Sequence, residues 1–326
     1  MKKLFLFSVA GMFLASLVLG CKSSPKPLND LSSPSAAVLH IGEISRTADE
    51  MELEIDVAVF RDSKHIEDAL DEKSFSIDTI PHRFYFVNKN VKLVAGNGVK
   101  PYRVLMLMDQ SSSIKNNDRQ NFRLDAAKIF SGNLGQGGQA MLWSFPGQHK
   151  LINKHSETFT ADSNLLIKQI DGLLGKEQGG TPLYESQDSA LVTLANHAEN
   201  IPKFLLTFTD GESNRQKQVE ELIYRANELK IPFYNIALKK RAVLLQMEQA
   251  MKTDGLYLQA KEAPQLISFF GNLGNVLNKS ASYYKTVWKV KPYKGLWSNR
   301  RQMLHSLKVN LPYSSQPIEV PFYFKD

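Results

Sequence analysis

The chain has 326 residues, of which 43% are hydrophobic and 22% are charged. This size and composition allow one or two ordinary folded cores and fit neither a disordered chain nor a coiled coil. The formal net charge is +7, and it falls to +5 if Lys2 and Lys3 are removed with a cleaved leader. A charge of this size does not by itself imply nucleic acid, and we expect no nucleic-acid partner.

The first twenty residues have the pattern of a secretory signal peptide. Two lysines precede an apolar stretch over residues 4–19, which is shorter than the roughly 20 residues that a membrane-spanning helix needs. The next segment, Leu17-Val18-Leu19-Gly20-Cys21, resembles the lipobox of bacterial lipoproteins, and Cys21 is the only cysteine in the sequence. The resemblance implies an extracytoplasmic protein that a lipid on Cys21 anchors to a bacterial membrane. The outer membrane or cell surface is favoured because Lys22 gives no retention signal of the Asp type, and an uncleaved anchor or ordinary secretion remain alternatives.

Two kinds of sequence pattern follow Cys21. Residues 21–36 are rich in Ser and Pro, which is typical of a flexible tether. Residues 37–98 are mostly β in pattern, because residues 51–57 alternate apolar and acidic side chains. Residues 83–87 are a further predicted strand, with turn residues around Asn88 to Asn90.

From Arg103 onward the pattern changes to alternating strands and helices. Residues 104–108 form a continuous apolar run, typical of a strand that is buried on both faces of a parallel sheet. The repeated alternation over residues 99–283 predicts a doubly wound, mostly parallel α/β sheet with helices on both faces. The later predicted strands are 140–145, 203–209, 233–238 and 256–259, and the predicted helices are 122–130, 163–174, 181–197, 218–229, 243–252 and 263–277.

After residue 283 the period-two alternation of strands returns. We therefore expect one discontinuous β-sandwich that is built from residues 37–98 and 284–326, with the α/β domain of residues 99–283 inserted between its two sections. Because the predicted helix over 263–277 runs into the second section, we hypothesise that occupancy of a site in the α/β domain is coupled to the angle between the domains.

The C-terminal part is also unusually basic, with no acidic residue between Glu262 and Glu319. A solvated sheet face with its aromatic side chains turned inward explains this stretch, and a patch that meets an anionic envelope surface is the alternative. The basic residues are Lys279, Lys285, Lys289, Lys291, Lys294, Arg300, Arg301 and Lys308.

Three polar loops of the α/β domain contain the candidate ligand-binding residues. They are Asp109-Gln110-Ser111-Ser112-Ser113, Gly179-Gly180-Thr181-Pro182 and Thr209-Asp210-Gly211-Glu212. Each alone is explained as a turn or a helix start, with Thr181 as an N-cap. Together they gather at one edge, because ligand sites of open α/β sheets lie at the carboxyl ends of the strands. Two carboxylates and three hydroxyls without His or Cys suit a hard cation, Mg²⁺ first, then Mn²⁺ or Ca²⁺.

In order and context these residues resemble the metal-ion-dependent adhesion site of von Willebrand factor A (vWA) domains. The resemblance covers about residues 100–282. It implies that Ser111, Ser113 and Thr181 bind the metal through hydroxyl oxygens, and that Asp109 and Asp210 act mostly through metal-bound water. A cation held largely by neutral hydroxyls keeps charge on its outward face and attracts a carboxylate. The resemblance therefore implies a binding device and not an enzyme.

The sequence thus predicts a membrane-anchored adhesion protein that engages an exposed Asp or Glu of a protein partner, with Glu212 as a candidate contact. One alternative is a structural lipoprotein of an envelope complex that needs no metal. The other is an α/β hydrolase, which we disfavour because the edge loops show no nucleophile–base pair. The glycine-rich stretch 134–138 precedes a strand and so does not suit a phosphate loop, and His149 and His155 are expected to be surface histidines.

Overall fold

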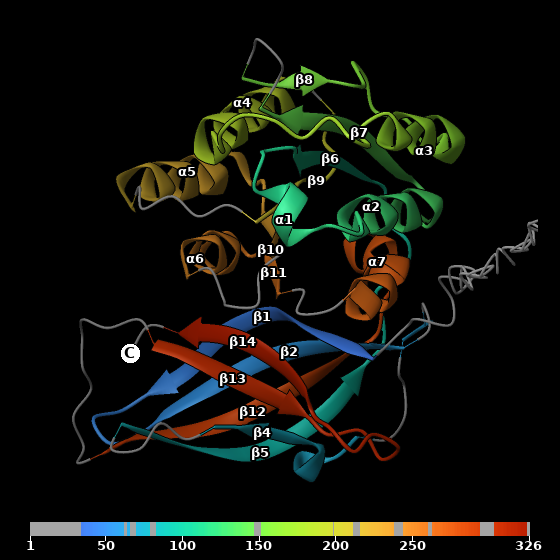
Figure 1. The fold of residues 1–326 in the computed structure, drawn as a ribbon. Coiled ribbons are helices and arrows are strands. Elements are labelled where there is room, and N and C mark those ends of the chain that lie inside the picture. The colour runs from blue at the N-terminus through green and yellow to red at the C-terminus, as the bar shows by residue number, and fades with distance from the viewer. Residues whose placement is uncertain are drawn as a thin grey trace, which may run out of the picture.

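In the computed structural model an α/β domain packs against a β-sandwich, as Figure 1 shows. The structure describes residues 34–61, 64–65, 70–78, 83–146, 151–197, 199–210, 216–237, 244–259, 263–293 and 303–324. The signal segment, Cys21 and Glu212 lie outside these ranges. None of the helices in the described ranges is long and apolar enough to cross a membrane.

The β-sandwich combines both ends of the chain. Its first sheet has the order β1-β2-β12-β5, with β3 paired to β2, and its second has the order β14-β13-β4. Each sheet therefore contains strands from both sections, which confirms the discontinuous sandwich predicted from the sequence. The elements are β1 (Ser35–Arg46), β2 (Met51–Arg61), β3 (Lys64–His65), the 3-10 turn η2 (Glu72–Ser74), β4 (Phe75–Ile77), β5 (Phe84–Val94), β12 (Tyr283–Pro292), β13 (Met303–Val309) and β14 (Ile318–Phe324).

Two details of the N-terminal section differ from expectation. The predicted tether reaches residue 36, but β1 begins at Ser35, because Ala36 and Ala37 are buried against β2. The predicted turn around Asn88 to Asn90 is wrong, since β5 runs through it to Val94. A register shift opposite these residues in β12 accommodates them as a β-bulge, so the asparagines interrupt the ladder without ending the strand.

Acidic residues of the N-terminal section neutralise part of the basic C-terminal stretch. Within this stretch, Tyr284 and Trp288 are buried in the sandwich core, as the solvated-face interpretation expects. Contact with an anionic envelope surface stays a prediction, and Lys294, Arg300 and Arg301 lie outside the described ranges. The ion pairs are Lys285–Glu54 (2.6 Å), Lys289–Glu50 (2.9 Å), Lys291–Glu50 (3.8 Å) and Lys308–Asp78 (2.9 Å).

The sandwich core contains a titratable side chain, His305 of β13. It is 3% exposed and lies against the rings of Phe84, Phe86 and Phe322. Burial lowers the pKa of His305 to about 4 from its ordinary value of 6.5. The unfolded chain therefore binds a proton more readily than the folded one, and stability falls as the pH drops from 6.5 toward 4.

We predict that His305→Leu removes this acid sensitivity. At pH 5 the difference between the two pKa values corresponds to a loss of about 2 kcal/mol in the free energy of unfolding of the wild type. Urea unfolding at pH 7.5 and at pH 5 measures it. Leu307→Ala in the same core is the control, because its loss of stability should be equal at both pH values. An equal pH dependence in His305→Leu and in the wild type would contradict the assignment.

The α/β domain is a six-stranded sheet between two layers of helices. Figure 1 shows α2, α3 and α7 on one side of the sheet and α4, α5 and α6 on the other, and each layer has its own buried core. The strands are β6 (Tyr102–Asp109), β7 (Gly138–Phe145), β8 (Asn153–Lys154), β9 (Lys203–Thr209), β10 (Phe233–Ala237) and β11 (Leu256–Gln259). The helices are α1 (Ile114–Asn117), α2 (Phe122–Gly132), α3 (Ser163–Asp171), α4 (Leu183–Asn196), α5 (Gln216–Leu229), α6 (Leu244–Lys252) and α7 (Ala263–Leu277).

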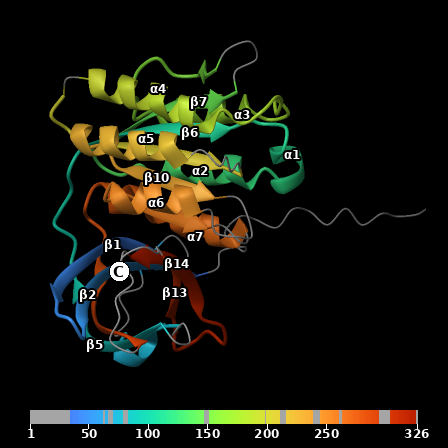
Figure 2. The same ribbon diagram turned by 90° about the vertical axis from the view of Figure 1, so that its left-hand side faces the viewer.

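The strand order of this sheet indicates the edge at which a ligand site is expected. The order is β11-β10-β9-β6-β7-β8, with every pair parallel except β7–β8. The chain starts in the middle at β6, proceeds to one edge through β7, and then returns to the other side of β6 with β9. In doubly wound sheets, ligands bind where the strand order reverses in this way. The reversal here lies between β6 and β9, and α1 stands beside the sheet at this end (Figure 2).

Candidate metal centre

Asp109 and Asp210 meet at the switch point of the sheet. Asp109 is the last residue of β6 and Asp210 directly follows β9. The two strands are parallel neighbours in register from Arg103 and Lys203 onward. The Thr209 hydroxyl donates to Oδ2 of Asp109 over 2.6 Å, so the two strand ends are joined directly.

Two serines of the loop after β6 complete an array of oxygen atoms. The Ser111 backbone N–H donates to Oδ1 of Asp109 (2.7 Å), which folds the loop back over the strand end. The Ser111 and Ser113 hydroxyl oxygens are 3.0 Å apart, and the Ser113 hydroxyl donates to Oδ1 of Asp210 (2.9 Å). Ser113 is the N-cap residue of α1 (Ile114–Asn117), but its side chain makes no capping hydrogen bond. Four of the five predicted residues are therefore connected through direct or bridged contacts.

The two carboxylates are buried, and none of the described residues provides a cationic partner. Asp109 is 0% exposed and Asp210 is 1% exposed. No Lys, Arg or His forms an ion pair with either of them in the part of the chain that the structure describes. Burial raises the pKa of Asp109 to about 6, although hydrogen bonds from Ser111 and Thr209 oppose the rise, and the nearby Asp210 adds to it. This edge of the sheet therefore concentrates negative charge that a bound cation would offset.

Thr181 lies on a loop that is held against the same turn. Both the backbone N–H (3.2 Å) and the hydroxyl (2.7 Å) of Ser112 donate to the carbonyl of Gly179. Gly179 has a φ of +71°, and a Cβ at this position would come within 3.1 Å of Pro146, so the turn favours glycine. The N-cap of α4 is Pro182, so the expectation that Thr181 caps this helix is wrong. Its hydroxyl makes no hydrogen bond within the described ranges and is available to a ligand.

The two serine hydroxyls are close enough to bind one small cation. Neighbouring ligand oxygens around an octahedral ion with bonds of 2.0–2.1 Å are about 2.8–3.0 Å apart. The Ser111 and Ser113 hydroxyl oxygens are 3.0 Å apart, which is compatible with this spacing and is also an ordinary hydrogen-bond length. The described residues contain no group of three or more His, Cys, Asp and Glu side chains that could hold a metal. A cation at this edge would therefore depend on the hydroxyl oxygens as well as on the carboxylates.

Two residues of the site are absent from the sequence-based prediction. Thr209 is buried and positions Asp109, as described above. The Asn117 side-chain amide at the end of α1 donates to Oδ2 of Asp210 over 2.6 Å. Thr209 could have been suspected as the neighbour of Asp210, but no sequence signal marks Asn117, because its contact spans 93 residues of chain.

A buried arginine bonds to residues of three segments around the candidate site. Arg123 of α2 is 0% exposed and forms ion pairs with Asp118 (2.9 Å) and Glu177 (2.7 Å). Its guanidinium also donates to Oε1 of Gln110, the residue between Asp109 and Ser111. Burial acts against the Glu177 carboxylate, but its hydrogen bonds, chiefly from Arg123, outweigh burial and lower its pKa. One side chain thus connects the turn at residues 109–113, the end of α1 and the loop that leads to Thr181.

A serine–histidine pair lies at the same end of the sheet. Oγ of Ser144, near the carboxyl end of β7, is 2.8 Å from Nε2 of His155. His155 is half-buried, and burial together with the nearby Lys176 lowers its pKa. The sequence predicts neither this contact nor the partial burial of His155, which was expected to be a surface histidine. Both residues line a polar cavity of about 290 Å³.

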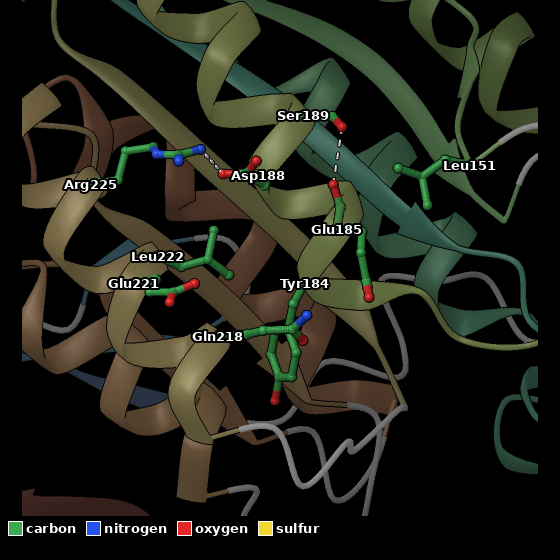
Figure 3. Close-up of a pocket in the computed structure, with 9 residues that line it drawn as sticks. All are labelled: Leu151, Tyr184, Glu185, Asp188, Ser189, Gln218, Glu221, Leu222 and Arg225. Carbon is green, nitrogen blue, oxygen red and sulfur yellow. Dashed lines mark hydrogen bonds and ion pairs between the residues drawn. The ribbon is translucent and has the colours of Figure 1, made fainter.

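A larger cavity lies elsewhere, between the outer faces of α4 and α5 (Figure 3). Its volume is about 360 Å³, and Tyr184, Leu222 and Leu151 line it together with charged residues. An ion pair between Arg225 and Asp188 spans the two helices beside it. None of the five predicted metal ligands contributes to its wall, so we do not associate it with the metal centre.

Three solved structures illustrate what the chain is similar to. A von Willebrand factor type A protein from Catenulispora acidiphila is 11% identical, with a TM-score of 0.44 over 79% of this chain and 74% of that chain. The pilus adhesin SpaC from Lactobacillus rhamnosus GG is 11% identical, with a TM-score of 0.46 over 87% of this chain and 47% of that chain. Proximal thread matrix protein 1 from the mussel byssus, with a zinc-occupied MIDAS motif, is 14% identical, with a TM-score of 0.45 over 62% of this chain and 50% of that chain.

No family model and no curated protein sequence matches the chain. At identities of 11–14% and TM-scores of 0.44–0.46, what each of these proteins binds remains a property of that protein. The chain is therefore placed by its own architecture: a doubly wound, mostly parallel α/β sheet inserted in a discontinuous β-sandwich.

Proposed function

We propose that the chain is a vWA-like adhesion or assembly protein that binds an acidic residue of a protein partner through a divalent cation, Mg²⁺ first. Asp109, Ser111, Ser113, Thr181 and Asp210 would hold the cation. The protein would act outside the cytoplasm, anchored to a bacterial membrane, outer membrane or cell surface, by a lipid on Cys21. Glu212 is proposed as a contact to the partner.

One observation carries this proposal. Two almost fully buried carboxylates, Asp109 and Asp210, share a sheet edge with the Ser111 and Ser113 hydroxyls, and no cationic side chain of the described residues is bonded to them. A bound dication would supply the missing positive charge. The hydroxyls of Ser111 and Ser113 would contact it without cancelling its charge, so the exposed side would attract a carboxylate. The proposed site is therefore suited to recognition of an acidic group.

We predict that Ser113→Ala weakens Mg²⁺ binding at least about tenfold, as loss of metal-site interactions commonly does. Ser113 is exposed, but its hydroxyl donates to the buried Asp210 carboxylate, so its truncation should also lower the stability of the metal-free protein by about 1 kcal/mol. Isothermal titration of the purified chain with Mg²⁺, repeated with Mn²⁺, measures the affinity. Ser189→Ala is the matched control, because its hydroxyl donates to the Glu185 carbonyl within α4 and not to the cluster. Equal Mg²⁺ affinity in all three proteins would contradict the site.

The partner is tested with the same variants. Envelope extract is passed over the immobilised protein in Mg²⁺ and in EDTA. We expect one bound protein that is lost in EDTA and on Ser113→Ala and retained on Ser189→Ala. Mutation of exposed Asp and Glu residues of that protein then identifies the carboxylate.

A metal-independent structural role is the second candidate, and one observation favours it. The Asp210 carboxylate already accepts hydrogen bonds from Ser113 and Asn117, so the edge is partly satisfied without a cation. A structural lipoprotein of an envelope complex would retain its partner both in EDTA and on Ser113→Ala.

A hydrolase is the third candidate, and the Ser144–His155 pair is the observation in its favour. The Ser144 side chain lies on a strand and the residue is 1% exposed, which leaves a substrate carbonyl little access to its oxygen. Turnover of p-nitrophenyl acetate that is abolished by Ser144→Ala would establish this activity over the binding role.

A further inference from the structure

The cavity of about 290 Å³ beside the metal centre has a polar wall that no other function of the molecule explains. It lies between the carboxyl end of β7, the edge strand β8 and the loop before Gly179. Ser144, Asn153, His155, Lys176 and Gln178 supply hydroxyl, amide, imidazole and ammonium groups to it. A cavity of this size holds a small polar group and is too small for a folded element.

Hydrogen bonds hold two of the lining residues in place. The Ser144 hydroxyl and the His155 ring are bonded to each other over 2.8 Å. The backbone of His155 is held twice, because its N–H donates to the Leu142 carbonyl (3.0 Å) and its carbonyl accepts from the Gln169 amide (2.7 Å). The imidazole is therefore preorganised, and a ligand would not have to order it.

The charges around the cavity favour an anion. Lys176 lines it and forms no ion pair within the described ranges, although it is close enough to His155 to lower its pKa. The acidic group in the wall, Glu177, is already bonded to the buried Arg123 over 2.7 Å. An anion placed between Lys176 and His155 would thus meet a cation that is not ion-paired with any carboxylate of the described residues.

The cavity and the metal centre share a wall. Gln110 lines the cavity and lies between Asp109 and Ser111 in the metal-binding turn. Its carbonyl accepts from the Gln178 N–H over 2.7 Å, and its own N–H donates to the Phe145 carbonyl. Gln178 also lines the cavity and directly precedes Gly179, whose loop carries Thr181. A ligand that occupies both sites therefore needs to span only this short wall.

From this geometry we infer that the cavity is a second recognition site, for a carboxylate group, held by Lys176 and the His155 ring beside the proposed metal centre. The carboxylate belongs to a second acidic side chain of the partner or to a free small carboxylate. The first source rests on the proposed function, and the second does not.

The first experiment tests the cavity alone. Glutarate is titrated into the full chain in EDTA, and the binding is followed by the chemical shifts of the His155 ring, with glutaramide as an uncharged probe of the same shape. We expect saturable binding of glutarate that weakens about tenfold on Lys176→Gln, the effect of losing one charge-assisted hydrogen bond. Lys168→Gln, at an exposed lysine of α3 outside the cavity, should not change it. Absence of saturation, equal binding of glutaramide, or no effect of Lys176→Gln would overturn the inference.

The second experiment distinguishes the two sources. Peptides with one glutamate or with two glutamates at varied spacing are titrated in Mg²⁺. A two-glutamate peptide that binds at least about tenfold tighter than the one-glutamate peptide, with the gain lost on Lys176→Gln and retained on Lys168→Gln, assigns the cavity to the partner. Glutarate binding in EDTA without such a gain assigns it to a free carboxylate. Failure of the metal centre alone would abolish the Mg²⁺ effect and leave glutarate binding in EDTA intact.

Discussion

Asp109→Asn is expected to stabilise the metal-free protein and to remove its response to Mg²⁺. A rise in the pKa of Asp109 from 3.8 to about 6 corresponds to about 3 kcal/mol at 1.36 kcal/mol per unit. Because the folded-state pKa is the higher one, the favourable contribution is present below pH 3.8 and is lost as the pH rises to 6. At pH 7.5 in EDTA the wild type therefore carries a buried charge that Asn lacks, and we expect the variant to be about 2–3 kcal/mol more stable.

The local hydrogen bonds tolerate this change. The side-chain oxygen of Asn can still accept from the Ser111 N–H, and its amide can donate to the Thr209 hydroxyl, which then reverses its role. In Mg²⁺ at about 100 times its dissociation constant, the wild type should gain about 2.7 kcal/mol from binding and the variant almost nothing.

Urea unfolding in EDTA and in Mg²⁺ at pH 7.5 measures both effects. Asp254→Asn is the control, since its side chain is 88% exposed and its charge should matter little in either buffer. A variant that is less stable than the wild type in EDTA would show that the Asp109 charge is compensated by something other than a cation. An equal Mg²⁺ response in the two proteins would remove Asp109 from the site.

Local pattern was sufficient to predict the fold class. The apolar run at residues 104–108 becomes β6, a central strand whose residues are all buried. The returning period-two pattern after residue 283 becomes β12, which lies between β2 and β5. Hydrophobic periodicity depends only on which face of an element is buried, so it predicts the element even when the elements that pack against it are unknown. Turn composition is weaker evidence, as the bulge around Asn88 to Asn90 shows, because a ladder with a partner on one side tolerates an extra residue.

The candidate site was predictable only where its residues adjoin strand ends. Asp109, Ser111 and Ser113 come directly after β6, and Asp210 comes directly after β9, so topology alone brings them together. Asn117 is on α1 and reaches Asp210 only because that short helix turns back over the edge. Such contacts depend on three-dimensional packing and leave no periodic or compositional trace in the sequence.

The same limit explains the missed serine–histidine pair. Ser144 and His155 are 11 residues apart, on β7 and just after β8, and they meet because β8 folds back antiparallel to β7. The two-residue strand β8 is too short for any alternation of side chains to predict it. Without that strand, His155 could only be assigned to a loop.

Arg123→Met should have the largest effect on stability of any single substitution considered. Removing one partner from a buried ion pair costs about 3–5 kcal/mol, because the other charge is left without compensation. Here the loss leaves two carboxylates without their guanidinium partner, and both are largely buried, Asp118 at 5% exposure and Glu177 at 8% exposure. Met retains much of the apolar volume of the arginine side chain, so the cost is mainly electrostatic.

A double-mutant cycle separates charge from packing in this network. Glu177→Gln removes one of the two stranded charges, so it should destabilise the wild type but recover part of the loss in the Arg123→Met background. Arg225→Met is the matched control, because the Arg225–Asp188 pair is 46% and 45% exposed and such pairs contribute about 0–1 kcal/mol. Equal losses for the two arginines in urea unfolding would contradict a structural role for Arg123. Because its guanidinium also holds Gln110 beside Asp109, the Arg123→Met protein should bind Mg²⁺ more weakly even where it remains folded, which would link the stability of the buried network to the geometry of the proposed metal-binding turn.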